Sequence, residues 1–126
     1  MERTAAAVSP IQWYLTVWKR YALFEGRSGR PEFWWFVLGQ VVISFVLGML
    51  SQASGLFMIL WYIWALATIV PNLAVGARRL HDIGKSGWLQ LVGLIPIVGL
   101  VLLYFWALPS QPGPNQYGEG PLPPEP

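Results

Sequence analysis

The residues of this chain that could do chemistry gather in two short segments, residues 26–34 and residues 78–88. The first reads GRSGRPEFW and the second reads RRLHDIGKSGW. Both are basic, both contain glycine and serine, and both lead into a long apolar stretch. The first turn of a helix presents free amides and a partial positive charge, and glycines let a backbone wrap around an anion. We therefore predict a site for a phosphate headgroup. Five cations would form it: Arg27, Arg30, Arg78, Arg79 and Lys85.

Two acidic residues accompany these cations. Glu32 falls in the first turn of the predicted helix that follows the first segment, where the helix dipole favours an anion. It could also order an arginine across the gap between helices. Simple anchoring of the chain by its cations is the alternative, but anchoring needs neither Glu32 nor Asp82. The residues expected to support the site are Glu32, His81, Asp82, Gly84, Ser86 and Gly87.

His81 and Asp82 are neighbours in the sequence, and a carboxylate can orient an imidazole for catalysis. Adjacent residues rarely face each other, and spacing places no serine nucleophile beside them. We therefore predict no catalytic residue here and expect Asp82 to cap the following turn. The run at residues 84–86, Gly-Lys-Ser, is similar to the end of a phosphate-binding loop, but that motif needs a glycine where Arg79 stands. A P-loop is excluded.

The composition excludes several classes of protein. Charged residues make up 11% of the 126 residues and hydrophobic residues 55%, with a mean hydropathy of +0.48. A soluble domain carries about 25% charged residues. The chain has no cysteine and one histidine, which removes disulfides, thiolate metal sites and cysteine nucleophiles. We therefore expect an all-α membrane protein with no metal and no cofactor.

Three apolar stretches set the predicted architecture. Between Glu32 and Arg78 the sole ionisable side chain is that of Tyr62. This gap suits two membrane crossings separated by the small polar run at residues 51–55. At about 1.5 Å per residue, each apolar stretch covers roughly the 30 Å hydrocarbon core. The predicted transmembrane helices are residues 33–50, 56–77 and 88–108, which form one domain over residues 33–108.

A few residues inside the spans are predicted to shape helix packing. Pro71 and Pro96 each lack an amide donor and should bend the second and third helices. A hinge used by a ligand is the alternative interpretation. Ser44 and Gly48 form a pair of small residues four apart, which allows close approach of helices. Asn72 is the best candidate for a hydrogen bond between helices.

The two ends of the chain differ from its middle. Residues 1–9 are predicted to be disordered. Residues 10–32 are predicted to hold an amphipathic helix and a basic loop, and because the helix is too short to span, it should lie in the headgroup plane. Residues 109–126 contain seven of the eleven prolines and no helical pattern. We predict that they form a mobile tail.

The positive charges predict how the chain is oriented. All eight lysines and arginines precede the first predicted span or lie between the second and the third. With three spans these two places share one side of the membrane, and the positive-inside rule makes that side cytoplasmic. We therefore predict a multi-pass protein with a cytoplasmic N-terminus and an exported C-terminus. The cations then face anionic lipid, which accounts for the basic pI without nucleic acid.

Beyond these patterns, the chain resembles a known family. The two basic segments, together with Gly-Pro-Asn-Gln-Tyr-Gly at residues 113–118 and Pro121 in the tail, are similar to the Domain of Unknown Function 805 family. The resemblance covers roughly residues 13–121, and the second basic segment is its most specific part. Members of that family are small bacterial inner-membrane proteins. The resemblance therefore implies a location in the bacterial inner (cytoplasmic) membrane and no established activity.

The predicted function is a non-enzymatic role as a small accessory, scaffold or regulatory subunit that binds anionic lipid headgroups or a larger membrane partner. Three helices bury little surface, so we expect a homo-oligomer or a larger membrane complex. The runner-up is an oligomeric channel or transporter component, in which Gln40, Thr68 and Asn72 would line a shared axis. A third hypothesis is an enzyme that modifies lipid headgroups and depends on His81.

Overall fold

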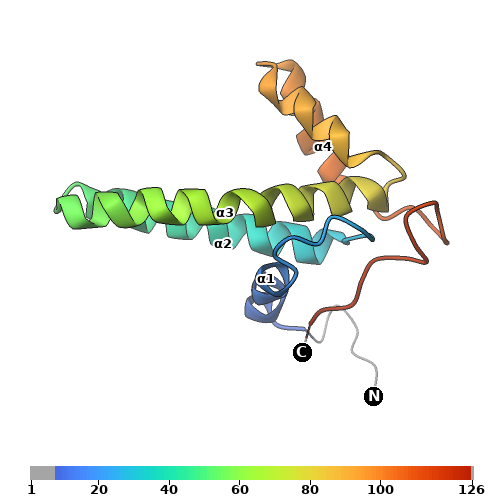
Figure 1. Cartoon of the computed structure of the whole chain (residues 1–126). Helices are drawn as coiled ribbons and strands as arrows, with labels where there is room; N and C mark the ends of the chain where they lie inside the picture. Colours follow the sequence, from blue (N-terminus) through green and yellow to red (C-terminus); the bar gives the residue numbers. More distant parts are fainter. Residues whose placement is uncertain (1–7, 126) are drawn as a thin grey trace.

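The structure, a computed structural model, describes residues 8–125, and its regular elements in that range are helices (Figure 1). This agrees with the predicted all-α class. The elements are α1 (Pro10–Lys19), α2 (Arg30–Ser51), α3 (Gly55–Asp82), the 3-10 helices η2 (Gly87–Leu94) and η3 (Val98–Leu100), and α4 (Val101–Ala107). Residues 1–7, most of the segment predicted to be disordered, lie outside the described residues.

α2 and α3 form a long pair that runs side by side and is joined by a short loop at residues 52–54 (Figure 1). Both helices are long and apolar enough to cross a membrane, which agrees with the first two predicted spans. Each extends beyond its predicted bounds into a basic segment, because α2 begins at Arg30 and α3 ends at Asp82. Their outward faces are apolar, with Phe45 67% exposed and Leu66 69% exposed. Lipid-facing side chains are expected to have this character.

α1 packs against the first half of α2. Ser9 begins α1 by accepting a hydrogen bond from the backbone amide of Gln12 at 3.1 Å, so Ser9 is a helix cap and not part of a disordered segment. The two helices approach closely at Gly39, where a Cβ would lie 2.4 Å from the ring of Tyr14. The helix predicted within residues 10–32 is therefore present. Its placement in the headgroup plane stays a prediction.

Polar side chains link α1, α2 and α3 beside a small apolar cluster. The hydroxyl of Tyr14 donates to Gln40 Oε1 at 2.8 Å, and Gln40 Nε2 donates to Asn72 Oδ1 at 3.4 Å. Asn72 thus makes the predicted hydrogen bond between helices. The predicted packing at Gly48 is not made by the described residues, because no neighbouring helix comes within 4 Å of a Cβ placed on Gly48. The buried cluster beside these groups consists of Val17, Phe33, Phe36 and Val75.

α3 runs through Pro71 without a break. Proline has no amide, so the carbonyl of Ala67, four residues earlier, loses its helical donor. The hydroxyl of Tyr21, in the loop after α1, donates to that carbonyl at 2.6 Å. The freed acceptor is therefore satisfied by another part of the chain, which is one way that membrane helices tolerate proline.

The third predicted helix, residues 88–108, is not continuous, and this prediction was wrong. The residue before a proline is disfavoured in the helical region, and Ile95 is extended, with φ −97° and ψ 116°. Ile97 then has φ 70°, and the amide of Val98 donates to the carbonyl of Pro96 at 2.7 Å. This bond closes a γ-turn. We expected Pro96 to bend a helix, but the chain reverses its direction there.

The reversal produces a hairpin of η2 and α4, residues 87–107, which projects from the α2–α3 pair near the end of α3 (Figure 1). Isoleucine and glycine recur at equal distances on either side of Pro96, at residues 95 and 97 and at residues 93 and 99, in the sequence LVGLIPIVGL over residues 91–100. Its arms approach closely at two glycines, since a Cβ on Gly99 would lie 2.9 Å from the Cα of Gly93. Each arm rises about 16 Å at the usual helical rises, which is short of a 30 Å hydrocarbon core.

The tail that follows α4 returns to the basic end of the α2–α3 pair. The amide of Gln111 donates to the carbonyl of Asp82 at 2.9 Å, and the amide of Leu122 donates to the carbonyl of Arg27 at 2.8 Å. The predicted mobile tail, residues 109–126, is thus held by hydrogen bonds over its described part. The prediction that a membrane separates the C-terminus from the basic segments also disagrees with these contacts. Both differences arise because the chain reverses at Pro96, so that the tail returns to the basic end of the α2–α3 pair.

Candidate functional site: a buried arginine and carboxylate network

Glycine and serine in the second basic segment end one helix and begin the next. Gly84 has φ 80°, its amide donates to the carbonyl of His81 at 3.0 Å, and the amide of Lys85 donates to the carbonyl of Leu80 at 2.9 Å. These two bonds form a Schellman motif, which ends α3 at a glycine. Ser86 then accepts from an amide in the first turn of η2. We expected Gly84 and Ser86 to support an anion site. In the structure Gly84 ends α3 and Ser86 caps η2.

Buried charged side chains gather where α2 begins and α3 ends. We call this group the arginine cap. Its members come from α1's C-terminal end, from the loop before α2, and from α2 and α3. They are Arg20, Arg27, Glu32, Arg78, Arg79 and Asp82.

Glu32 lies fully buried in the first turn of α2 and binds two arginines. Arg20 Nη1 donates to one carboxylate oxygen at 2.8 Å, and Arg78 Nη2 donates to the other at 2.8 Å. Arg78 belongs to α3, so Glu32 pairs with an arginine across the helix gap, as the sequence suggested. Arg78 Nε also donates to Ser28 Oγ at 2.8 Å, which ties the loop before α2 to α3.

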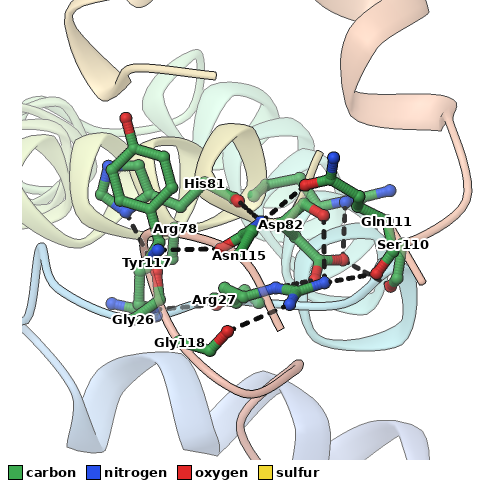
Figure 2. A network of polar contacts seen from close by, with 12 residues as sticks. Gly26, Arg27, Arg78, His81, Asp82, Ser110, Gln111, Asn115, Tyr117 and Gly118 are labelled. Carbon is green, nitrogen blue, oxygen red and sulfur yellow. Dashed lines mark hydrogen bonds and ion pairs between the residues drawn. The ribbon is translucent and has the colours of Figure 1, made fainter. Parts of the chain in front are cut away.

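Asp82, the last residue of α3, is the acceptor for the other half of the arginine cap (Figure 2). Arg27 Nε donates to Oδ1 at 2.9 Å, and Arg79 Nη1 donates to Oδ2 at 3.0 Å. The hydroxyl of Ser110, in the tail, also donates to Oδ2. The expectation that Asp82 caps the following turn was wrong, because its carboxylate is taken by these three donors.

Backbone carbonyls of the hairpin and the tail take the remaining donors of two arginines. Arg27 Nη1 donates to the carbonyl of Gly113 at 2.8 Å, and Arg27 Nη2 donates to that of Gln111 at 2.7 Å. Figure 2 shows the guanidinium of Arg27 between Asp82 and the tail. Arg79 donates to two carbonyls at the end of α4. The arginine cap therefore holds the hairpin and the tail against α3.

Each arginine of the arginine cap is paired with a carboxylate, although its four cations outnumber its two anions. A buried charge is costly unless it is paired and hydrogen-bonded. Each of the four guanidinium groups has a carboxylate oxygen within 3.0 Å, and backbone carbonyls share the excess positive charge. The partly exposed Glu125 adds an ion pair with Arg20 at 3.2 Å. The network thus works as an internal lock that joins α1, α2, α3, α4 and the tail.

The five cations of the predicted anion site separate into two groups. Arg27, Arg78 and Arg79 are buried in the arginine cap, where carboxylates and carbonyls occupy them. Arg30 and Lys85 are exposed. The five side chains therefore do not form one open clamp around a ligand, and the exposed pair alone is available to an outside anion.

The segments that build the arginine cap are also those that carry the family resemblance. A family model described as "Protein of unknown function (DUF805)" matches residues 21–119. The chain belongs to the DUF805 family. The matched range contains both long helices, the hairpin, most of the tail and every member of the arginine cap except Arg20.

Relatives of this DUF805 chain include proteins of Escherichia coli (strain K12). "Inner membrane protein YhaH" is 39% identical over 117 residues, which cover 88% of this chain and 97% of the relative. "Inner membrane protein YhaI" is 39% identical over 113 residues, covering 88% and 96%. "Uncharacterized protein YiiR" is 32% identical over 105 residues, covering 77% of this chain and 64% of the relative. No solved structure was found to match the chain.

His81 of the DUF805 chain has different partners from its neighbour Asp82. Its Nδ1 lies 3.0 Å from the carbonyl oxygen of Gly26. Its ring stacks on Tyr117 of the tail, with 3.9 Å between centroids and 5° between planes (Figure 2). Asn115 donates to the His81 carbonyl at 3.0 Å. Within residues 8–125, no three or more His, Cys, Asp or Glu side chains are grouped to hold a metal ion.

Sequence reasoning missed Arg20 and the tail as parts of this site. Arg20 follows α1, which we expected to lie on a membrane surface with its cations facing anionic lipid, yet its side chain is 6% exposed. Ser110 and Gln111 reach the arginine cap because the hairpin returns. The motif at residues 113–118, which contributed to the family resemblance, was the sequence feature that pointed to the tail.

Proposed function

We propose that this chain is a non-enzymatic accessory or scaffold subunit of the bacterial inner membrane. The location is supported by the apolar helices α2 and α3 and by the names of the two Escherichia coli relatives. The observation that carries the role is the arginine cap. Its four arginines and two carboxylates hold five parts of the chain together, which is a structural use of charged groups. The arginine cap would then form a rigid polar end on the α2–α3 pair, which anchors the chain in the membrane.

The proposed topology follows from the same contacts. We place α1, the arginine cap and the tail on the cytoplasmic side, since all the positive charges lie at that end or before it and the loop at residues 52–54 has none. α2 and α3 then cross the membrane. The hairpin, with arms too short to cross, enters and leaves the same leaflet.

We assign contact with anionic headgroups to Arg30 and Lys85, the two exposed cations of the predicted anion site. Arg30 begins α2, where no side chain caps the helix, so the partial positive charge of the helix end adds to that of the guanidinium. It also lines a cavity of about 500 Å³ beside the prolines of the tail. Lys85 lies between α3 and η2. Each basic residue near an anionic surface contributes about 1 kcal/mol.

Lipid and protein co-purification tests this proposal. The wild-type chain is extracted in mild detergent beside an Arg30→Gln/Lys85→Gln variant and a charge-preserving Arg30→Lys/Lys85→Arg control. Removing both charges should lower affinity for phosphatidylglycerol by about tenfold or more, as measured by mass spectrometry, while the control retains the lipid. Equal phosphatidylglycerol in all three samples contradicts the headgroup contact. A chain that runs as a lone monomer in every mild detergent contradicts the accessory role.

The structure does not favour the two other hypotheses from the sequence. Gln40 and Asn72 hydrogen-bond to each other, and Thr68 Oγ1 donates to the carbonyl of Ala65 in its own helix. These polar side chains therefore have partners within one chain. The Nδ1 of His81 is bound to the carbonyl of Gly26, and the ring is stacked on Tyr117 of the tail. We therefore propose neither a channel nor a headgroup-modifying enzyme.

A further inference from the structure

A cavity of about 490 Å³ lies between α3 and η2, and the loop after α1 and the tail complete its walls. This volume falls within the range of small-molecule sites, about 300–1,000 Å³. Most of its lining is apolar, and the apolar side chains are Phe24, Leu73, Ala77, Trp88 and Leu91. The cavity does not include the arginines of the cap. It is therefore a separate place where a ligand with an apolar part would fit.

The cavity follows α3 from Leu73 to His81. The eight helical steps between these two residues correspond to a rise of about 12 Å. Leu73 lies in the apolar part of α3, whereas His81 is next to the arginine cap at the polar end. A ligand in the cavity would therefore place its apolar part toward the membrane interior and its polar part at the cytoplasmic interface, as a phospholipid does.

The walls of the cavity are held in place by close contacts. A Cβ on Gly87 would lie 2.8 Å from the Cβ of Ala77, so η2 approaches α3 as closely as a glycine permits. Gln90 Nε2 donates to the carbonyl of Leu73 at 3.0 Å. A Cβ on Gly76 would lie 2.2 Å from Gln90 Oε1. The contact between α3 and η2 therefore fixes two walls of the cavity.

His81 offers one unused hydrogen-bonding atom to this cavity. Its Nδ1 donates to the carbonyl of Gly26, and in a neutral imidazole that bond leaves Nε2 as an acceptor. Nε2 lies on the cavity side of the ring, because a Cβ on Gly87, which lines the cavity, would be 3.5 Å from it. The stack on Tyr117 holds the plane of the ring. No group of residues 8–125 is found to donate to Nε2.

We propose that this cavity binds one acyl chain of a membrane phospholipid whose headgroup donates a hydrogen bond to His81 Nε2. An ethanolamine headgroup carries such N–H donors, and a choline headgroup carries none. The site goes beyond the proposed contact of anionic headgroups with Arg30 and Lys85. It uses different residues, and it selects for a donor and not for charge.

The experiment compares two zwitterionic lipids with the same chains. The purified protein is incubated in detergent with equal amounts of dioleoyl phosphatidylethanolamine and dioleoyl phosphatidylcholine, and retained lipid is counted by native mass spectrometry. One hydrogen bond should favour the ethanolamine lipid by about twofold to tenfold. Because both lipids have no net charge, the exposed cations do not produce this preference. Equal retention of the two lipids by the wild-type chain overturns the proposal.

Cavity-filling variants locate the binding. Leu73 is 46% exposed and Leu91 is 58% exposed, so Leu73→Trp and Leu91→Trp can each enter the cavity from opposite walls without disturbing the buried core. Both should abolish retention of the ethanolamine lipid. Leu66→Trp, on the same helix but outside the cavity, is the matched control and should retain it. Retention of the ethanolamine lipid by either cavity variant overturns the proposal, so one folded variant is enough for the test if the other fails to fold.

The role of the imidazole has its own test. His81→Asn keeps a donor near the position of Nδ1 and removes the acceptor at Nε2. It should retain a phospholipid but lose the preference for ethanolamine over choline. A preference that persists in His81→Asn contradicts the assigned hydrogen bond. An added arm with dioleoyl phosphatidylglycerol keeps the two proposals distinct, because the Arg30→Gln/Lys85→Gln variant should lose that lipid and still prefer ethanolamine to choline.

Discussion

Two prolines in apolar helical stretches have opposite outcomes in this chain. α3 continues through Pro71, whereas the stretch that contains Pro96 reverses direction. At Pro71 the freed carbonyl of Ala67 accepts from the hydroxyl of Tyr21 at 2.6 Å. At Pro96 no comparable donor from another element is found among the described residues. The preceding residue, Ile95, is extended, and the chain turns back.

The difference shows that proline alone does not decide between a tolerated helix and a turn. α3 is packed against α2 and α1, and the side chain of Tyr21 supplies a donor in place of the missing amide. The hairpin has few such neighbours, and its tip is exposed, with Ile97 83% exposed. The chain that returns from the hairpin then meets the arginine cap, where Arg79 binds the last carbonyls of α4. The hydrogen bond from Tyr21 therefore stabilises α3 at Pro71, whereas the arginine cap holds the end of the hairpin.

The largest expected effect concerns the side of the membrane on which the tail lies. The chain has no cysteine, so single cysteines can be placed at the exposed Gln116 in the tail and at the exposed Ala53 in the α2–α3 loop. A membrane-impermeant maleimide should label Ala53→Cys from outside intact spheroplasts and should label Gln116→Cys after lysis. The physical reason is that the hairpin turns back at Pro96.

The matched variant for this comparison is Pro96→Ala. Restoring the amide should favour one continuous helix over residues 88–108, which is long enough to cross. Labelling of Gln116→Cys from outside should then increase in the Pro96→Ala background. External labelling of Gln116→Cys in the unmodified background would show three crossings and would contradict the topology.

A second effect tests the network that holds the returning chain. Asp82→Asn leaves Arg27 and Arg79 buried without their carboxylate, and removing one partner of a buried ion pair costs about 3–5 kcal/mol. Thermal unfolding in detergent, followed by tryptophan fluorescence, should show this loss, and protease should cut the tail faster. Glu119→Gln, an exposed change in the same tail, is the control and should shift stability by about 0.5 kcal/mol or less. Equal stability of the two variants would mean that the arginine cap does not hold the tail.

The smallest expected effect concerns the hydrogen bond from Tyr21 to the carbonyl of Ala67, which replaces the amide that Pro71 lacks. Tyr21→Phe leaves the carbonyl of Ala67 without its donor and should cost about 1–3 kcal/mol in the same unfolding assay. In a Pro71→Ala background the new amide donates to Ala67, so the tyrosine change should cost less. The coupling energy between the two changes is expected to be about 1 kcal/mol. Additive costs would show that Tyr21 stabilises the fold in some other way.

The predictable parts of this protein are those with a local physical cause. Long runs of apolar residues predict α2 and α3, because a helix satisfies its own backbone polar groups in lipid. Glu32 could be assigned to a first helical turn and an arginine partner from its position alone. The burial of Arg27, Arg78 and Arg79 could not be predicted, because the same residue types serve equally well in water or beside headgroups.

The order of the amino acids is enough to predict that the chain is helical, that two of its helices suit a membrane, and that its lysines and arginines lie outside the apolar stretches. These properties follow from composition and spacing, which act over a few residues. The tertiary structure alone decided that the third apolar stretch turns back, that the tail is bound, and that the arginines form an internal lock. Each of those outcomes depends on whether a donor or acceptor from a distant part of the chain arrives within hydrogen-bonding distance.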